Sequence, residues 1–180
     1  MHGMVSLLDS QHYRLVENIW RELEKECGLT GVKVTPYPHF SWQVGSEYAE
    51  PQTEQAIRAL ARQTRPFTVR AGGLGIFSGP NPVVYIPIIR SPKMDRLHAK
   101  LWKHFESSAK GISPFYSPQN WMPHITLIFG EESVRSILCG LETLAFRSFD
   151  WDIEVTNLSF IRQSNGQVGT LSYRHDFLPG

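Results

Sequence analysis

The sequence predicts an α+β fold built as two similar β-α-β-α-β lobes, with mainly antiparallel sheets that face a central cleft. Its composition is that of a folded globular chain, since 41% of the 180 residues are hydrophobic and 19% are charged. The order of expected strands and helices also occurs twice. Matching points lie at a nearly constant interval, with 85 residues from His39 to His124 and 84 from Phe67 to Trp151. We interpret this as an internal duplication; the alternative is that the halves of any α+β protein can resemble each other.

The chain is therefore expected to form one bilobal domain over residues 1–180, with a first repeat at about 4–77 and a second at about 83–178. In the first repeat, a short strand precedes a helix that Asp9 or Ser10 begins and Gly28 ends. The remaining elements are a strand, a helix and an extended segment, at about 39–44, 52–65 and 67–77.

The second repeat follows the same order. A strand at 83–89 leads to a helix that Ser91-Pro92 begins, in the favoured arrangement of a cap before a proline, and that Gly111 ends. A second strand is expected at 123–129 and a second helix at 132–146. The repeat ends with a strand at 151–161, a turn at 164–166 and a returning strand at 169–178.

The most informative feature is a motif that occurs once in each repeat. Pro38-His39-Phe40-Ser41 and Pro123-His124-Ile125-Thr126 each place a hydroxyl residue two positions after a histidine on an expected strand. Because residues i and i+2 of a strand project from the same face, each strand presents one imidazole and one hydroxyl together. The alternating residues are apolar and are expected to pack behind the strand.

This set of side chains is suited to proton transfer at a phosphate. Histidine has an unperturbed pKa near 6.5, so one ring can be neutral and accept a proton while the other is charged and donates one. Hydroxyl groups can donate hydrogen bonds to phosphate oxygens. A single strand histidine is more often a core or surface residue, but two in matching motifs favour a site. Metal binding by His39 and His124 is the weaker alternative, because no carboxylate or cysteine lies nearby at ligand spacing.

The two motifs, their separation and the repeated lobes resemble the 2H phosphoesterase superfamily, which includes 2′-5′ RNA ligase-like proteins and cyclic phosphodiesterases. The resemblance covers most of the chain. Trp121 to Leu127 matches the usual sequence of this motif in the family. The first motif differs, because it has Ser41 where Thr is commoner and Trp42 where Leu is usual.

The resemblance implies a metal-independent phosphodiesterase that opens 2′,3′-cyclic phosphates of nucleotides or RNA ends. It implies that His39 and His124 are the acid and the base and that Ser41 and Thr126 bind the phosphate. The alternatives are a noncatalytic nucleotide- or RNA-binding module, and RNA-end ligation or 3′-end trimming by the same site. No cofactor is expected.

Four further residues are candidate substrate contacts. Tyr116 and Trp121 precede the second motif in a proline-rich loop and could stack on a base, although packing is the commoner role of aromatic residues. Arg90 and Arg162 end strands at comparable places and could bind a phosphate, but a solvated arginine is an equal alternative. The other histidines are interpreted as incidental, namely His2, His12, His98, His104 and His175.

Charge and cysteine content indicate which partners and which cellular compartment to expect. The net charge of +1 gives no general affinity for long nucleic acid or an anionic membrane, so the expected partner is a nucleotide or a short RNA end. No apolar run approaches the length of a membrane span, and the N-terminus has no signal pattern. Cys27 and Cys139 fall in expected helices and are interpreted as reduced. We expect a cytoplasmic monomer.

Overall fold

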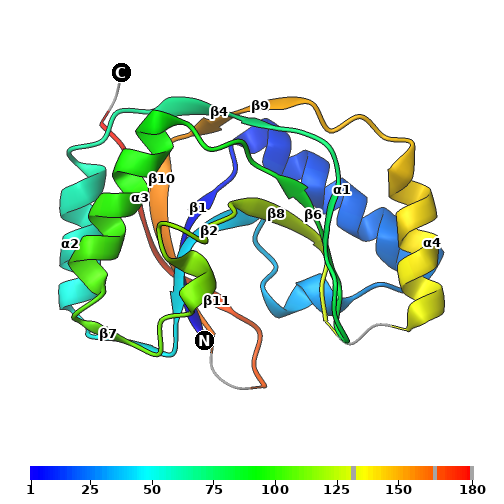
Figure 1. Cartoon of the computed structure of the whole chain (residues 1–180), viewed down its shortest axis with the longest axis horizontal. Helices are drawn as coiled ribbons and strands as arrows, with labels where there is room; N and C mark the ends of the chain where they lie inside the picture. Colours follow the sequence, from blue (N-terminus) through cyan, green and yellow to red (C-terminus); the bar gives the residue numbers. More distant parts are fainter. Residues whose placement is uncertain (131–132, 164–165, 179–180) are drawn as a thin grey trace.

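The computed structural model describes residues 1–130, 133–163 and 166–178, and it shows a mixed α+β architecture (Figure 1). A four-stranded antiparallel sheet has the order β11-β10-β1-β2, and a three-stranded antiparallel sheet has the order β5-β6-β8. The strands of the first sheet are β1 (His2–Leu7), β2 (His39–Gly45), β10 (Asn157–Arg162) and β11 (Thr170–Asp176). Those of the second are β5 (Gly75–Phe77), β6 (Val83–Pro87) and β8 (His124–Ile128). The predicted α+β class with mainly antiparallel sheets is confirmed.

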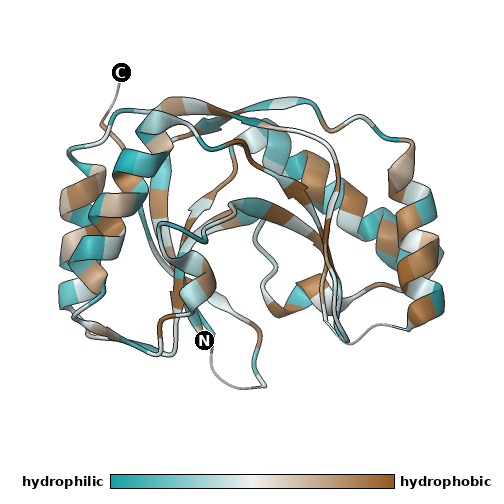
Figure 2. Ribbon diagram, in the orientation of Figure 1, coloured by the Kyte–Doolittle hydropathy of each residue, from teal (hydrophilic) through white to brown (hydrophobic). Residues whose placement is uncertain are grey.

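Helices cover one face of each sheet. The helices α2 (Gln52–Ala61) and α3 (Pro92–Phe105) lie against the four-stranded sheet. The helices α1 (Ser10–Cys27) and α4 (Val134–Ala145) lie side by side, and α1 contacts β8 of the three-stranded sheet. Figure 2 shows that these helices carry both apolar and hydrophilic residues, as expected of helices with one buried side.

Two small antiparallel ribbons complete the connections. The strands β4 (Phe67–Ala71) and β9 (Trp151–Val155) pair along the top of Figure 1, where they span both lobes. The shorter pair is β3 (Glu47–Tyr48) with β7 (Ala109–Lys110), which was not predicted. Two single-turn 3₁₀ helices, η1 (Gly31–Val34) and η2 (Pro114–Tyr116), lie in the loops before the two motif strands.

Each lobe takes elements from both halves of the chain, whereas the sequence predicted one lobe for each repeat. The strand β10 of the second half pairs with β1, and β5 of the first half pairs with β6. The helices cross over in the same way, because α3 packs on β2 and α1 packs on β8. Local sequence cannot reveal this exchange, since the pattern of a strand does not identify its partner. Buried side chains of both lobes form one large cluster.

Several predicted ends of elements are confirmed. Asp9 caps α1 and accepts hydrogen bonds from the backbone N–H groups of Gln11 and His12, and Gly28 ends the helix at a φ of 71°. Ser91 caps α3 by accepting from the N–H of Met94, and Pro92 is the first residue of that helix.

Other predicted ends are wrong. The helix α3 ends at Phe105, and Gly111 instead forms a separate turn at a φ of 57°. The helix α2 ends at Ala61 rather than near residue 65, and the segment predicted as one strand at 151–161 is divided into β9 and β10. Residues 131–132, at the predicted start of the last helix, and 164–165, in the predicted hairpin turn, lie outside the described residues.

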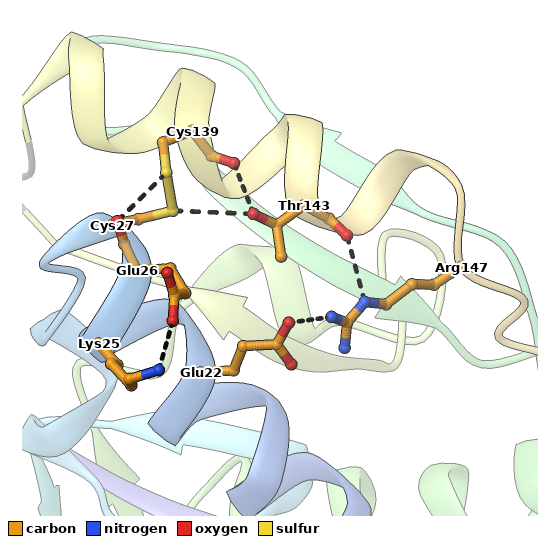
Figure 3. Close-up of polar contacts among 7 residues, drawn as sticks. All are labelled: Glu22, Lys25, Glu26, Cys27, Cys139, Thr143 and Arg147. Atoms are coloured by element: carbon orange, nitrogen blue, oxygen red, sulfur yellow. Dashed lines mark hydrogen bonds and ion pairs between the residues drawn. A yellow bond between two sulfur atoms is a disulfide. The ribbon is translucent and has the colours of Figure 1, made fainter.

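The interpretation of Cys27 and Cys139 as reduced is also wrong, because the structure joins them in a disulfide (Figure 3). Cys27 ends α1 and Cys139 lies in α4, and their Cα atoms are 5.7 Å apart. This spacing is within the range that a disulfide requires. An ion pair between Arg147, just after α4, and Glu22 of α1 links the same two segments. The sequence could not show that these helices, 112 residues apart at the cysteines, pack together.

Among the described residues, no helix combines the length and the apolar character that a membrane span needs.

Candidate active site

The two motifs lie on the edge strands of the two sheets. The strand β2 is the last strand of the four-stranded sheet, β8 is the last strand of the three-stranded sheet, and the two strands contact each other. The predicted alternation holds as far as Trp42 and Leu127, but Val44 and Phe129, which were expected to pack behind the strands, line the cleft. In β2 the pairing with β1 shifts register between Ser41 and Gln43, which turns the following residues over. In β2, Phe40 and Trp42 are fully buried while His39 and Ser41 are partly exposed. In β8, Ile125 and Leu127 are buried while His124 and Thr126 are partly exposed.

All four motif side chains line one cleft. Its volume is about 710 Å³, and His39, Ser41, His124 and Thr126 are among the residues that form its wall. This volume is in the range of sites for small organic ligands, roughly 300–1,000 Å³. The geometry that the motifs predict, two imidazoles and two hydroxyls on one cavity, is therefore what the fold produces.

Each imidazole is held at Nδ1 by the backbone just before it. His124 Nδ1 lies 2.7 Å from the carbonyl oxygen of Met122, and His39 Nδ1 is bonded to the carbonyl oxygen of Tyr37. A carbonyl only accepts, so Nδ1 carries the proton in both rings. In a neutral ring this leaves Nε2 as the basic nitrogen. The proline between each histidine and its carbonyl partner lacks an N–H group. It was predicted to be the first residue of the strand, but each strand begins at the histidine that follows it.

Burial lowers the pKa of both histidines below the ordinary value of 6.5. Desolvation brings the pKa of His39 to about 4, with the bond to the Tyr37 carbonyl opposing this change and the nearby charge of His124 adding to it. Desolvation also lowers the pKa of His124, and the Met122 carbonyl opposes it. Both rings are therefore neutral at pH 7 in the free protein.

The ring of His124 is surrounded by two aromatic side chains. Phe77 of β5 meets it edge to face, with 5.0 Å between ring centroids, and Tyr85 of β6 lies at the same distance. Tyr85 stacks on Phe77 and lies directly over Gly75, where any Cβ would collide with the Tyr85 ring. The glycine in β5 thus lets this aromatic wall form beside His124.

Side-chain N–H groups bond to carbonyls of the two motif strands. The indole of Trp121 donates to the carbonyl of Ser41 at 2.9 Å, and the indole of Trp20, from α1, donates to the carbonyl of Thr126 at 3.1 Å. His98 of α3 lies with its Nε2 at 3.1 Å from the carbonyl of Trp42. Buried carbonyls need hydrogen-bond donors, and these side chains supply donors to carbonyls of both motif strands.

The candidate substrate contacts fall into two groups. Trp121 is only 1% exposed, with its ring stacked on His98 at 3.9 Å and on Trp42 at 5.1 Å, so it packs rather than offering a face to a base. Tyr116 lines the cleft with its hydroxyl near the Ser41 side chain, and burial raises the pKa of that hydroxyl.

The two arginines are engaged elsewhere and are not among the residues that line the cleft. Arg90 pairs with Asp95 at 2.7 Å and donates to the carbonyl of Trp121, while its guanidinium lies over the Trp121 ring. Arg162 pairs with Glu50 at 3.3 Å. Arg90 thus supports the loop that precedes the second motif.

His98 was interpreted as incidental, but it is 1% exposed and connects α3 to the first motif strand. Its position could have indicated burial. It lies four residues after Met94 and three before Leu101, on the apolar stripe of its helix. The sequence does not show that its partner is a motif carbonyl.

Within the described parts of the chain, no group of three or more His, Cys, Asp or Glu side chains is placed to hold a metal ion.

Known proteins with similar sequences or folds indicate the family to which this chain belongs. The family model described as the 2′-5′ RNA ligase superfamily matches residues 11–167. Proteins of Bacillus cytotoxicus and Bacillus mycoides with the provisional name of phosphoesterase are 27% and 26% identical over 93 residues. That match spans 50% of this chain and 50% of each relative.

Solved structures share the fold over nearly the whole chain. TT0787 of Thermus thermophilus has a TM-score of 0.66 at 19% identity, and 98% of each chain is covered. E. coli LigT in complex with 3′-AMP has a TM-score of 0.59 at 17% identity, with 98% of this chain and 96% of that one covered. Because the family model accounts for most of the sequence, including both motifs, the chain belongs to the 2′-5′ RNA ligase superfamily of 2H phosphoesterases.

Proposed function

We propose that this protein is a metal-independent phosphodiesterase that opens 2′,3′-cyclic phosphates by general acid–base catalysis with His39 and His124. The observation that carries the proposal is the pair of imidazoles on one cleft, each with Nδ1 bonded to a backbone carbonyl and Nε2 left to transfer protons. Further support comes from the superfamily and from the fold shared with E. coli LigT, which has been solved with phosphate and with 3′-AMP.

The proposed reaction needs one neutral and one protonated imidazole. The neutral Nε2 takes a proton from water as the water oxygen bonds to phosphorus. The protonated Nε2 donates its proton to the ribose oxygen as the bond between that oxygen and phosphorus breaks. The product is a phosphate monoester, and the two rings have exchanged their protonation states. Each transfer contributes about 10²–10⁴-fold to the rate.

Substrate binding supplies the protonated ring. Both histidines are neutral at pH 7 in the free protein, because desolvation lowers their pKa values. A phosphate anion between the rings favours the charged form of an imidazole and raises its pKa. Ser41 and Thr126 lie beside the rings on the same cleft, and their hydroxyls donate hydrogen bonds to the non-bridging oxygens in this proposal.

The test is an assay of the EDTA-treated protein against 2′,3′-cyclic nucleotides of all four bases. We expect turnover to a monoester at a rate that the chelator does not change. Loss of activity on chelation, with recovery on addition of a divalent metal, would show a metal-bound hydroxide mechanism instead. Retention of nucleotide without any turnover would identify a binding module.

A further inference from the structure

Exposed apolar side chains gather around the mouth of the cleft. We define the apolar rim as Val34, Ile76, Phe115, Met122 and Phe129, which all line the cleft and are all exposed. They come from four separate places in the chain: the end of η1, strand β5, the loop before the second motif and the residue after β8. Single exposed apolar residues are ordinary, but several that converge on one cavity indicate a surface that binds something.

Three basic side chains of described residues near this cleft are each paired with a carboxylate. Lys33, beside Val34, is bonded to Glu24, Arg90 is bonded to Asp95, and Arg162 is bonded to Glu50. Among the described residues that line the cleft, His2, His39 and His124 are the ones whose side chains titrate near neutral pH, and the other side chains are apolar, aromatic or neutral polar. The backbone ammonium of Met1, which also lines the cleft, is bonded to the carbonyl of Gln163. The wall therefore suits a ligand with one anionic group at the motifs and an uncharged remainder.

An RNA end would present a different chemistry to this wall. Each added nucleotide brings another phosphate, and proteins that follow a nucleic-acid backbone contact these phosphates largely with Lys and Arg. A phosphate placed against Phe115 or Met122 would lose hydration without gaining a partner. The sugar and base of a single nucleotide, by contrast, carry no charge and have large apolar faces.

Resting on the proposed function, we infer that the substrate is a mononucleoside 2′,3′-cyclic phosphate, with its phosphate between the motifs and its uncharged nucleoside against the apolar rim. The end of an RNA chain is the class of substrate that the cleft disfavours. Recognition of the nucleoside then depends on area buried at the rim, which stabilises the ground state and the transition state alike and acts mainly on KM.

A chain-length series tests the inference. The substrates are a mononucleoside 2′,3′-cyclic phosphate and di-, tetra- and octaribonucleotides that end in the same cyclic phosphate. We expect kcat/KM to be highest for the mononucleotide and not to rise with length. A rise of tenfold or more with length would overturn this inference and leave the proposed activity intact. No turnover of any member by the folded protein would remove the proposed function as well, so the two failures are distinguishable.

Variants of the rim give a second, independent measurement. Phe115→Ser and Met122→Ser should each raise KM for the mononucleotide roughly tenfold with little change in kcat, because they remove apolar area that binds the nucleoside. Both residues are exposed, so folding should be preserved. The matched control is Phe146→Ser, since Phe146 is 95% exposed at the end of α4 and does not line the cleft.

Phe115→Lys tests the charge argument in the opposite direction. It should increase kcat/KM for the octanucleotide relative to the mononucleotide, because it adds a cation at the exposed rim, where the further phosphates of an oligomer can meet it. Unchanged KM values in Phe115→Ser and Met122→Ser would overturn the role of the rim. So would a fall in the relative activity of Phe115→Lys on the octanucleotide.

Discussion

The two motif strands each present an imidazole and a hydroxyl to the cleft, but different residues pack around them. In both, the histidine Nδ1 is bonded to the carbonyl two residues earlier, and the strand is the edge of its sheet. Both strands also receive an indole N–H on the carbonyl of the hydroxyl residue, from Trp121 at Ser41 and from Trp20 at Thr126.

The surroundings of the two histidines differ. Beside the first motif, the Tyr116 hydroxyl lies near the Ser41 side chain and His98 lies against the Trp42 carbonyl. Among the described residues, neither kind of contact is found at the second motif, but Phe77 and Tyr85 pack on its histidine ring. Burial brings the pKa of His39 to about 4, and the pKa of His124 is also lowered.

The difference shows how one short motif can serve two roles. The motif determines which nitrogen of each ring is free, because the carbonyl partner is local. The packing around the ring determines how easily that nitrogen is protonated, because desolvation depends on residues far away in the sequence. In the proposed mechanism, acid and base functions are divided between two residues with the same local sequence.

The largest expected effect concerns the histidines themselves. His39→Ala and His124→Ala should each reduce turnover of a 2′,3′-cyclic nucleotide by at least about 10²-fold, and the double variant should be little worse, because the pair acts as a unit. His104→Ala is the control, since His104 is exposed on α3 outside the cleft. Near-normal steady-state rates in either motif variant would show that the two strands are not equivalent partners.

The pH dependence tests the lowered pKa values. Because both pKa values lie below 6.5, the protonated acid of the free protein is populated only as the pH falls, and the neutral base is lost toward about pH 4. We expect a bell-shaped profile of kcat/KM with its maximum on the acid side of 6.5, and a fall of about tenfold per pH unit on the alkaline limb. The limbs report the pair rather than either histidine alone.

The profile of kcat provides the internal comparison. It reports the complex with substrate, in which the phosphate favours the charged imidazole, so its maximum should lie at a higher pH than that of kcat/KM. A kcat/KM that stays constant between about pH 5 and about pH 8 would contradict the assignment of two titrating histidines.

The hydroxyl residues should have smaller effects that compare the two strands directly. Ser41→Ala and Thr126→Ala should each cost about 1.5–3 kcal/mol of transition-state stabilisation, the loss of one hydrogen bond to a charged group. Tyr116→Phe removes the hydroxyl that lies near Ser41 and should affect only the first motif. Additive losses in Tyr116→Phe combined with Ser41→Ala would show that the Tyr116 hydroxyl does not act through Ser41.

The smallest expected effect concerns the indoles behind the strands. Trp121→Phe and Trp20→Phe keep most of the ring but remove the N–H that bonds to a motif carbonyl, and should lower kcat roughly 3- to 10-fold with little change in KM, given about 0.5–1.5 kcal/mol for a hydrogen bond. Trp151→Phe is the control, because no hydrogen bond from its indole is among those of the described residues. If all three variants behave alike, the indole bonds do not position the motifs.

Local sequence was enough to predict the two motifs, the shared face of each histidine and its hydroxyl partner, and the ends of several helices. These features depend on residues within a few positions of one another, through the alternation of a strand or the cap of a helix. The fold class was also predictable, because the order of strands and helices can be inferred from sequence patterns along the chain.

Only the tertiary structure decided which elements pair or pack against one another. The exchange of β5 and β10 between lobes, the disulfide between Cys27 and Cys139, and the contact of His98 with the first motif all join residues far apart in the sequence. It also decided that Trp121 is covered by rings on its faces and that Arg90 and Arg162 are paired away from the cleft. Such contacts depend on how whole elements pack, and a local pattern of polar and apolar residues specifies that an element is buried but not what buries it.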